Sequence, residues 1–173
     1  MIETARLLLR AMRSDDVDDL LRIFEDPKVM AAFERGPFGL DEMTRWVERN
    51  LAHQRRHGYG LFSVIHKAER LIVGDCGLEH RDIQGRAEIE LGYDFGSAYW
   101  RRGFATEAAS AVRDHAFGDP GITRLVSLIR SGNAASRRVA EKVGMRWEAD
   151  FVEGAVAYSL YAIEKVSCPT SGI

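Results

Sequence analysis

Three strand-like segments follow one another between residues 61 and 95, with no helical pattern between them. They read LFSVIHK (61–67), LIVGDCGLEH (71–80) and RAEIELGYDF (86–95), and only short polar stretches separate them. Connections this short join neighbouring antiparallel strands, because a parallel pair needs a long crossover. The middle of the chain is therefore predicted to form a β-meander, and the rest of the fold must pack around it.

Helical and strand-like patterns flank this meander. Apolar residues recur at helical spacing in the expected helices, which span 14–26, 40–58, about 102–117 and 133–144. The further expected strands span 4–10, 123–130, 145–151 and 156–165. The order β-α-α-β-β-β-α-β-α-β-β predicts a mixed α/β (α+β) architecture.

One domain is expected over residues 1–166, because no linker rich in Pro, Gly or Ser divides this part of the chain. Residues 167–173 are expected to form a flexible C-terminal tail. The net charge of −2 argues against a nucleic-acid partner. No apolar run approaches the roughly 20 residues of a membrane span.

The N-terminus carries no signal-peptide pattern. The two cysteines form no CxxC pair and the five histidines show no metal-ligand spacing. These features predict a cytoplasmic protein without a disulfide framework and without a bound metal.

The stretch YWRRGFATEAA (99–109) predicts an anion site. Arg101 and Arg102 precede Gly103, and a run of good helix formers follows. A helix N-terminus carries partial positive charge and free N–H groups, and a glycine lets the backbone approach a phosphate. A plain surface loop with two solvated arginines is the alternative. The glycine spacing fits neither a P-loop nor a Rossmann fingerprint.

The strand before this loop carries acids on one face. Glu88, Glu90, Gly92 and Asp94 share that face, because side chains alternate along a strand. A solvated or salt-bridged sheet face would explain the acids. If helices cover the face, Glu90 is a buried carboxylate, which needs a reason to be there.

Five segments in this order resemble the GNAT N-acetyltransferase superfamily: TARLLLR, ELGYDF, YWRRGFATEAA, NAASRRVAEKVGM and AYSLYA. More narrowly, the chain resembles the RimJ/RimL-type branch of ribosomal-protein N-terminal acetyltransferases. The resemblance covers nearly the whole chain. It implies the GNAT fold, in which a central mixed, mostly antiparallel, splayed sheet of about seven strands is flanked by about four helices.

The resemblance implies that the anion is the pyrophosphate of acetyl-CoA, the acetyl donor. The implied cofactor-binding residues are Tyr93, Phe95, Trp100, Arg101, Arg102, Gly103, Phe104, Ala105, Thr106 and Asn133. Tyr93 and Phe95 would pair with the pantothenate arm through their main chain. Trp100 stands where the superfamily usually has Gln or Arg, a replacement common in this branch.

The implied reaction is direct transfer of the acetyl group to a primary amine in a ternary complex. The amine is a protein N-terminus or a small molecule. Glu90 is the expected general base, directly or through a water, and Glu88 is the reserve. Ser136 is expected to position the thiol sulfur, because Ala140 occupies the position of the usual tyrosine acid.

The resemblance implies that the first two expected helices and the loop between them border the acceptor pocket. Phe33, Glu34, Phe38 and Glu88 are the expected substrate contacts. The chain is expected to act as a monomer or homodimer. Two alternatives remain open, a non-catalytic CoA-binding sensor or interaction module and a binding domain without a CoA site.

Overall fold

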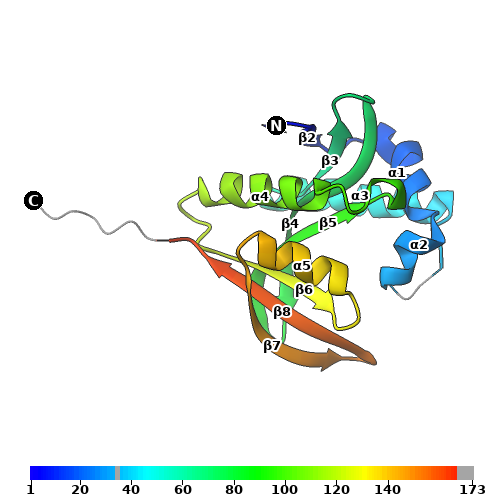
Figure 1. The fold of residues 1–173 in the computed structure, drawn as a ribbon. Coiled ribbons are helices and arrows are strands. Elements are labelled where there is room, and N and C mark those ends of the chain that lie inside the picture. Colours follow the sequence, from blue (N-terminus) through cyan, green and yellow to red (C-terminus); the bar gives the residue numbers. More distant parts are fainter. Residues whose placement is uncertain (34–35, 167–173) are drawn as a thin grey trace, which may run out of the picture.

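One open sheet organises the computed structural model, which describes residues 1–33 and 36–166. Its strands lie in the order β1-β2-β3-β4-β5-β6-β8-β7 (Figure 1). Every neighbouring pair is antiparallel except β5 and β6. The expected mixed, mostly antiparallel sheet is therefore confirmed, while the expected tail 167–173 lies outside the described residues.

The elements have the following bounds. The strands are β1 (Ile2–Glu3), β2 (Leu7–Ala11), β3 (Leu61–His66), β4 (Leu71–Ile83), β5 (Arg86–Phe95), β6 (Arg124–Arg130), β7 (Arg146–Glu153) and β8 (Val156–Glu164). The α-helices are α1 (Val17–Phe24), α2 (Pro27–Met30), α3 (Leu40–His57), α4 (Phe104–Phe117) and α5 (Ala134–Lys142), and 3-10 turns are η1 (Ser14–Asp16), η2 (Ala31–Phe33) and η3 (Ser97–Tyr99). The sequence did not predict β1 and α2, because elements this short show no period.

Helices cover both faces of the sheet. Apolar residues of α4 and α5 pack with β2 to β6 into one core, which includes Leu91, Phe95 and Val112. Residues of α1, α2 and α3 form a second core, which includes Phe24 and Met43. Glu88 and Glu90 on the acidic face of β5 are buried, whereas Gly92 and Asp94 on the same face are half-buried.

The sheet opens between β5 and β6, and the two halves diverge (Figure 1). Glu90 and Val126 are the single register pair of these strands within the described ranges, and β6 continues by pairing with β8. The Ser127 hydroxyl donates to the Leu91 carbonyl at 2.7 Å, which shows that Leu91 directs its main chain toward β6. Main-chain direction alternates along a strand, so Tyr93 and Phe95 face the same opening.

Candidate functional site

The loop between β5 and α4 ends in an uncapped helix N-terminus. Gly103 is the N-cap of α4 at φ +81°, and no side chain in the described part of the chain caps the helix. Arg101 also has a left-handed backbone, at φ +60°, a conformation that costs a non-glycine residue free energy and is often found at functional sites. The first-turn N–H groups of Phe104, Ala105 and Thr106 are therefore available to an anion. We call residues 100–106 the anion loop.

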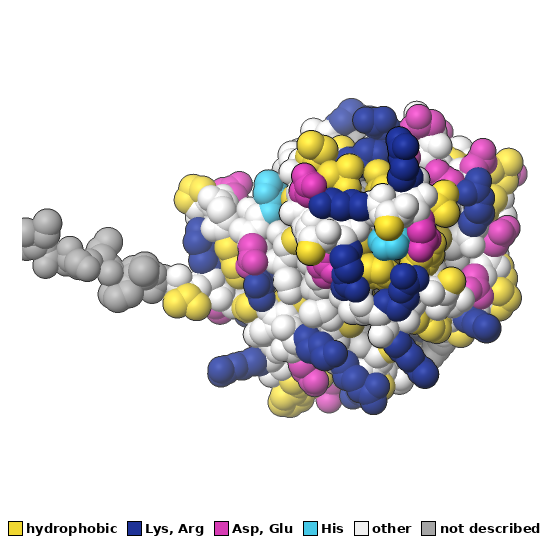
Figure 2. Space-filling view, turned by 45° about the horizontal axis from the view of Figure 1, so that its top comes forward, with side chains coloured by type: hydrophobic (Ala, Val, Ile, Leu, Met, Phe, Trp, Pro, Cys, Tyr) yellow, Lys and Arg dark blue, Asp and Glu magenta, His cyan; other side chains and the backbone are white. Residues whose placement is uncertain are grey.

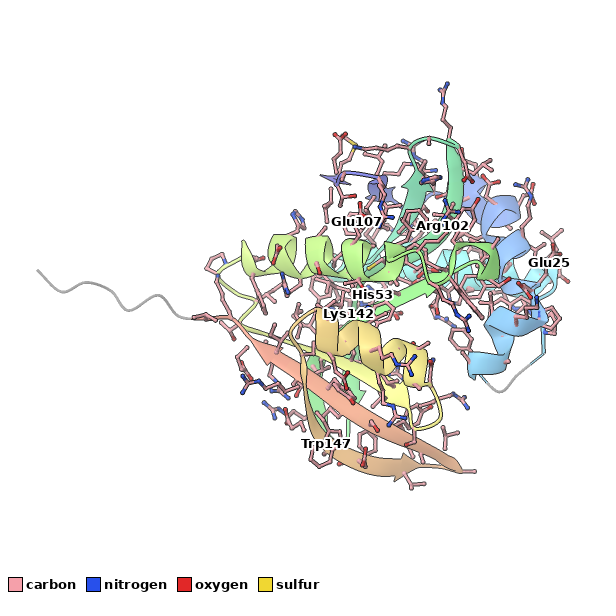
Figure 3. All side chains as sticks on the ribbon, in the orientation of Figure 1. Glu25, His53, Arg102, Glu107, Lys142 and Trp147 are labelled. Carbon is pink, nitrogen blue, oxygen red and sulfur yellow. The ribbon has the colours of Figure 1, made fainter. Side chains whose placement is uncertain are left out.

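Arg6 and Glu107 hold the anion loop in place. Arg6 Nη1 donates to the Arg102 carbonyl at 2.9 Å, and Arg6 Nη2 pairs with Glu107 Oε2 at 2.6 Å. Glu107 Oε1 also accepts from the Thr4 hydroxyl at 2.6 Å. Arg102 and Glu107 lie on the side of α4 that faces β2 (Figure 3). Sequence reasoning missed this support, because Arg6 and Glu107 are a hundred residues apart in the chain.

Two aromatic residues of the anion loop, Trp100 and Phe104, are fixed by contacts with the rest of the protein. Trp100 Nε1 donates to the Phe95 carbonyl at 2.7 Å, which ties the loop to the end of β5. Phe104 is buried in the core, and the guanidinium groups of Arg6 and Arg102 lie 4.4 and 4.9 Å from the centre of its ring. The Phe95 side chain is buried as well. Phe95 and Phe104 can therefore reach a ligand only through their main chain.

The start of α5 borders the opening of the sheet. Asn133 caps this helix, because its Oδ1 accepts from the Ser136 N–H at 3.0 Å. The Tyr93 hydroxyl donates to the Ser136 carbonyl at 2.8 Å, and burial raises the Tyr93 pKa. Ala140 is buried in the core. Asn133 thus has a structural role in α5, whether or not it also contacts a ligand.

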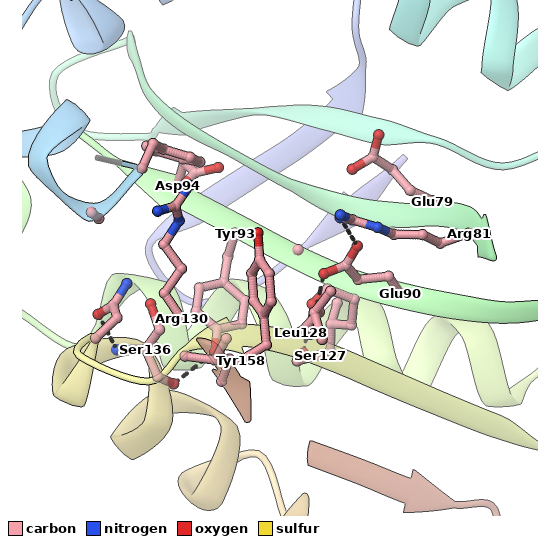
Figure 4. Close-up of a pocket in the computed structure, with 16 residues that line it drawn as sticks. Glu79, Arg81, Glu90, Tyr93, Asp94, Ser127, Leu128, Arg130, Ser136 and Tyr158 are labelled. Carbon is pink, nitrogen blue, oxygen red and sulfur yellow. Dashed lines mark hydrogen bonds and ion pairs between the residues drawn. The ribbon is translucent and has the colours of Figure 1, made fainter. Parts of the chain in front are cut away.

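A cavity of about 250 Å³ lies where β5 and β6 separate (Figure 4). Its walls come from η2, β4, β5, β6, β8 and the start of α5. The lining residues are Ala32, Phe33, Glu79, Arg81, Glu90, Leu91, Gly92, Tyr93, Asp94, Ser127, Leu128, Ile129, Arg130, Asn133, Ser136 and Tyr158. The cavity therefore brings together Phe33, Glu90, Tyr93, Asn133 and Ser136 from the residues singled out in the sequence.

Glu90 is buried and both of its carboxylate oxygens have partners. The side chain is 7% exposed. Arg81 Nη1 donates to Glu90 Oε2 at 2.7 Å, and the Leu128 N–H donates to Oε1 at 3.2 Å. Burial raises the Glu90 pKa, while the charge of Arg81 opposes that shift. Glu90 thus accepts a hydrogen bond from the main chain of β6 at the point where β6 separates from β5.

Asp94 lines the same cavity, yet none of the described residues gives its carboxylate a hydrogen bond or ion pair. Burial, together with the charges of Glu79 and Glu90, raises the Asp94 pKa to about 7. Asp75 stands opposite Asp94 in the β4–β5 register. The sequence placed Asp94 on the correct face, but it gave no signal that separates Asp94 from Glu90.

Tyr158 is a second lining residue that sequence reasoning did not single out for a role. It projects from β8 across the cavity (Figure 4). Its ring lies 6.0 Å from the Arg130 guanidinium. For a tyrosine in the last strand, the neighbouring sequence does not indicate whether the side chain lines a cavity or packs in the core.

Two of the expected substrate contacts, Phe38 and Glu88, lie away from the cavity. Phe38 is 8% exposed and packs in the second core, with its ring centre 5.5 Å from that of Phe24. Glu88 pairs with Arg86 at 3.0 Å and with Arg124 at 3.2 Å, and neither Phe38 nor Glu88 lines the cavity. Glu34 lies outside the described residues.

Neither the surface charge nor the arrangement of potential metal ligands indicates a further binding site in the described part of the chain. Basic and acidic side chains are mixed over the face drawn in Figure 2. Within residues 1–33 and 36–166, no group of His, Cys, Asp or Glu side chains is arranged to hold a metal ion. No helix in these ranges is both long and apolar enough to span a membrane.

Comparisons with known proteins agree on one family. A family model described as "Acetyltransferase (GNAT) domain" matches residues 6–146. The chain is 34% identical over 145 residues to the uncharacterized protein YkkB of Bacillus subtilis (strain 168), a match that covers 83% of this chain and 84% of that protein.

Solved structures with the same fold include two acetyltransferases. An acetyltransferase (GNAT family) from Bacillus anthracis superposes with a TM-score of 0.79 at 28% identity, covering 94% of this chain and 97% of that one. RimL, a ribosomal L7/L12 alpha-N-protein acetyltransferase in complex with coenzyme A, superposes with a TM-score of 0.77 at 18% identity, covering 94% and 96%. At 18% identity the second similarity shows the fold alone.

Proposed function

The chain belongs to the GNAT acetyltransferase family, and from that premise we propose that it transfers the acetyl group of acetyl-CoA to a primary amine. The observation that carries the proposal is the opening between β5 and β6, which lies beside both the anion loop and the cavity. One opening thus gives access to an anion site and to a pocket of acids. When bound, acetyl-CoA would supply an acetyl thioester that an amine can attack.

The anion loop suits a pyrophosphate. The free N–H groups at the start of α4 point outward from a helix end that carries partial positive charge. Gly103 presents no side chain to a ligand, and an added Cβ there would meet only the end of Arg6, at 3.5 Å. Arg101 and Arg102 add charge to the same loop. We assign Trp100 to Thr106 to the donor site on these grounds.

The opening itself suits an extended chain with amide groups. Tyr93 directs its main-chain N–H and C=O groups into it, and Phe95 directs its N–H, as an unpaired sheet edge does. The Phe95 carbonyl already accepts from Trp100 Nε1. The pantothenate arm of the donor carries amides that can pair with such an edge. Asn133 and Ser136 face the opening from α5 and would flank the arm near the sulfur.

The chemistry needs three groups from the chain. The Phe95 N–H would donate to the carbonyl oxygen as negative charge develops there. The lining residues with hydroxyl groups are Tyr93, Ser127, Ser136 and Tyr158. The hydroxyls of Tyr93 and Ser127 already donate to main-chain carbonyls, so those of Ser136 and Tyr158 are available to the departing sulfur. A carboxylate must accept a proton from the ammonium group of the acceptor, and Glu90 and Asp94 are the two candidates for this general base.

The acceptor belongs in the cavity. Phe33 supplies an apolar wall, and Glu79, Glu90 and Asp94 supply negative charge, which favours a cationic amine. The RimL neighbour is a ribosomal L7/L12 alpha-N-protein acetyltransferase, so both peptides and small amines are reasonable acceptors. The fold does not choose between them.

Acetylation of a panel of amines tests the proposal. The panel comprises a Ser-initiated peptide, an Ala-initiated peptide, a peptide with an internal lysine, and spermidine, each with acetyl-CoA. We expect the wild type to add one acetyl group to at least one acceptor, detected by mass spectrometry and by release of free thiol. Binding of acetyl-CoA without transfer to any amine would favour the sensor alternative, and absence of binding would exclude both.

A further inference from the structure

Two aspartates lie side by side at the end of the cavity. Asp75 on β4 and Asp94 on β5 are register partners, and such partners place their Cβ atoms about 5 Å apart on the same face of the sheet. Asp94 lines the cavity. Asp75 lies behind it, 1% exposed.

Asp75 is an unusual buried group. Neither of its carboxylate oxygens has a hydrogen-bond partner among residues 1–33 and 36–166. An ionised carboxylate without donors is very costly in a protein interior, so the group keeps its proton instead. Burial and the charge of Asp94 raise the Asp75 pKa well above its usual value. Asp75 is therefore the neutral member of the pair, and Asp94 is the member that ionises.

Glu90 on the same face is the opposite case. An arginine and a main-chain N–H occupy its two oxygens, so its lone pairs already have donors. A base must be free to take a proton from its substrate, and it works best when its pKa lies near the working pH. Both carboxylates line the cavity (Figure 4), but among the described residues only Glu90 has hydrogen-bond and ion-pair partners, which leaves the Asp94 oxygens open to a substrate.

We propose that Asp94, with the neutral Asp75 behind it, takes the proton from the acceptor ammonium group; this inference rests on the proposed function. The Asp94 carboxylate accepts one proton and the ammonium becomes a neutral amine. The amine nitrogen then forms the C–N bond while the C–S bond of the thioester breaks. The second proton of the nitrogen goes to the sulfur, which leaves as a thiol, and Asp94 releases its proton to water.

Charged groups around Asp94 set the pH at which it works. Asp75 and Glu79 face it from β4, and Glu90 faces it from β5. Arg81 on β4 is paired with Glu90, and Arg130 reaches the cavity from β6. The η2 residues that line the cavity, Ala32 and Phe33, carry no charge. Glu79 contributes the largest of the charge effects that raise the Asp94 pKa.

A carboxyl titration tests the pair without any acceptor. The wild type is labelled with ¹³C at the aspartate carboxyls and titrated by NMR between about pH 4 and 9. We expect one titration midpoint near pH 7, which belongs to Asp94. Asp94→Asn should abolish this midpoint, and Glu79→Gln should lower it. A second midpoint, at higher pH, should be absent in Asp75→Asn. Asp18→Asn, an exposed position in α1, is the matched control and should change neither. A midpoint near 7 that survives Asp94→Asn, or none at all, would overturn the assignment.

The pH dependence of turnover tests the catalytic step. For an acceptor that the wild type acetylates, Asp94→Asn should lower kcat by about 100-fold near pH 7. The deficit should shrink at higher pH, because more of the amine is already neutral there. Glu90→Gln should keep the rise in kcat near pH 7, and Asp18→Asn should match the wild type.

The outcomes separate the two proposals. A wild type that acetylates no amine contradicts the proposed function. A wild type that acetylates an amine, with a kcat profile unchanged by Asp94→Asn, contradicts this inference and leaves the proposed function intact.

Discussion

The anion loop and the cavity lie at the same opening of the sheet but are built from different groups. The loop offers main-chain N–H groups held by a left-handed glycine and by arginines. The cavity offers side chains from four strands, with three carboxylates among them. A site made of main-chain groups depends on the backbone conformation and tolerates many side-chain substitutions. A site made of side chains changes its binding properties with each substitution. The two regions should therefore respond to different mutations.

Gly103→Glu should have the largest effect, on the donor half alone. A glutamate at φ +81° is strained, and its charge would face the phosphates. We expect acetyl-CoA binding to weaken by more than about 100-fold, which removes about 2.7 kcal/mol of ligand stabilisation at saturating donor. Thermal melting with and without acetyl-CoA measures this loss of ligand stabilisation. Gly85→Glu is the control, because Gly85 has the same φ of +81° and open space around it; equal losses in both variants would contradict the assignment.

Gly92→Leu should affect the acceptor half alone. An added Cβ at Gly92 meets no atom within 4 Å, and a leucine fits a strand, so the fold should survive. The side chain would fill the cavity and lower kcat/KM for the amine by about 100-fold, with the Kd for acetyl-CoA changed by less than about threefold. Unchanged turnover would mean that the amine binds elsewhere.

Asp94→Asn should change stability in a pH-dependent way. In the wild type the folded Asp94 keeps its proton up to a pKa of about 7, while the unfolded aspartate loses it near 3.9. The folded state therefore binds more protons between these values, and this contribution to stability falls as pH rises from about 4 to about 7. Relative to the wild type, the variant should gain on the order of 10 °C in Tm across this window. A constant difference between the two melting curves would contradict the raised pKa.

Glu107→Gln should have the smallest effect of this set. It weakens the contacts with Arg6 and Thr4 that hold the anion loop. We expect a loss of about 1–2 kcal/mol in the free energy of unfolding and a several-fold weaker Kd for acetyl-CoA, with the Asp94 titration unchanged. Urea unfolding and calorimetry measure the two effects. A change in acceptor KM without a change in donor Kd would contradict the role given to Glu107.

The sequence predicted the loop better than the cavity, for a physical reason. Gly103 and the helix that follows form a local motif, so their geometry depends on neighbours in the chain. The roles of Glu90 and Asp94 depend on Arg81, Leu128 and Asp75, which approach them only once the sheet forms. The structure buries Phe38 in the second core, which the sequence could not predict, because an apolar residue near a pocket and one in the core look alike in sequence.

Backbone NMR with coenzyme A tests the central claim most directly, because the ligand lacks the acetyl group and cannot react. The account predicts the largest amide shifts at Tyr93, Phe95 and residues 103–106, with little change in the β7–β8 hairpin around residues 153–156. Shifts concentrated in that hairpin, with the anion loop unchanged, would contradict it.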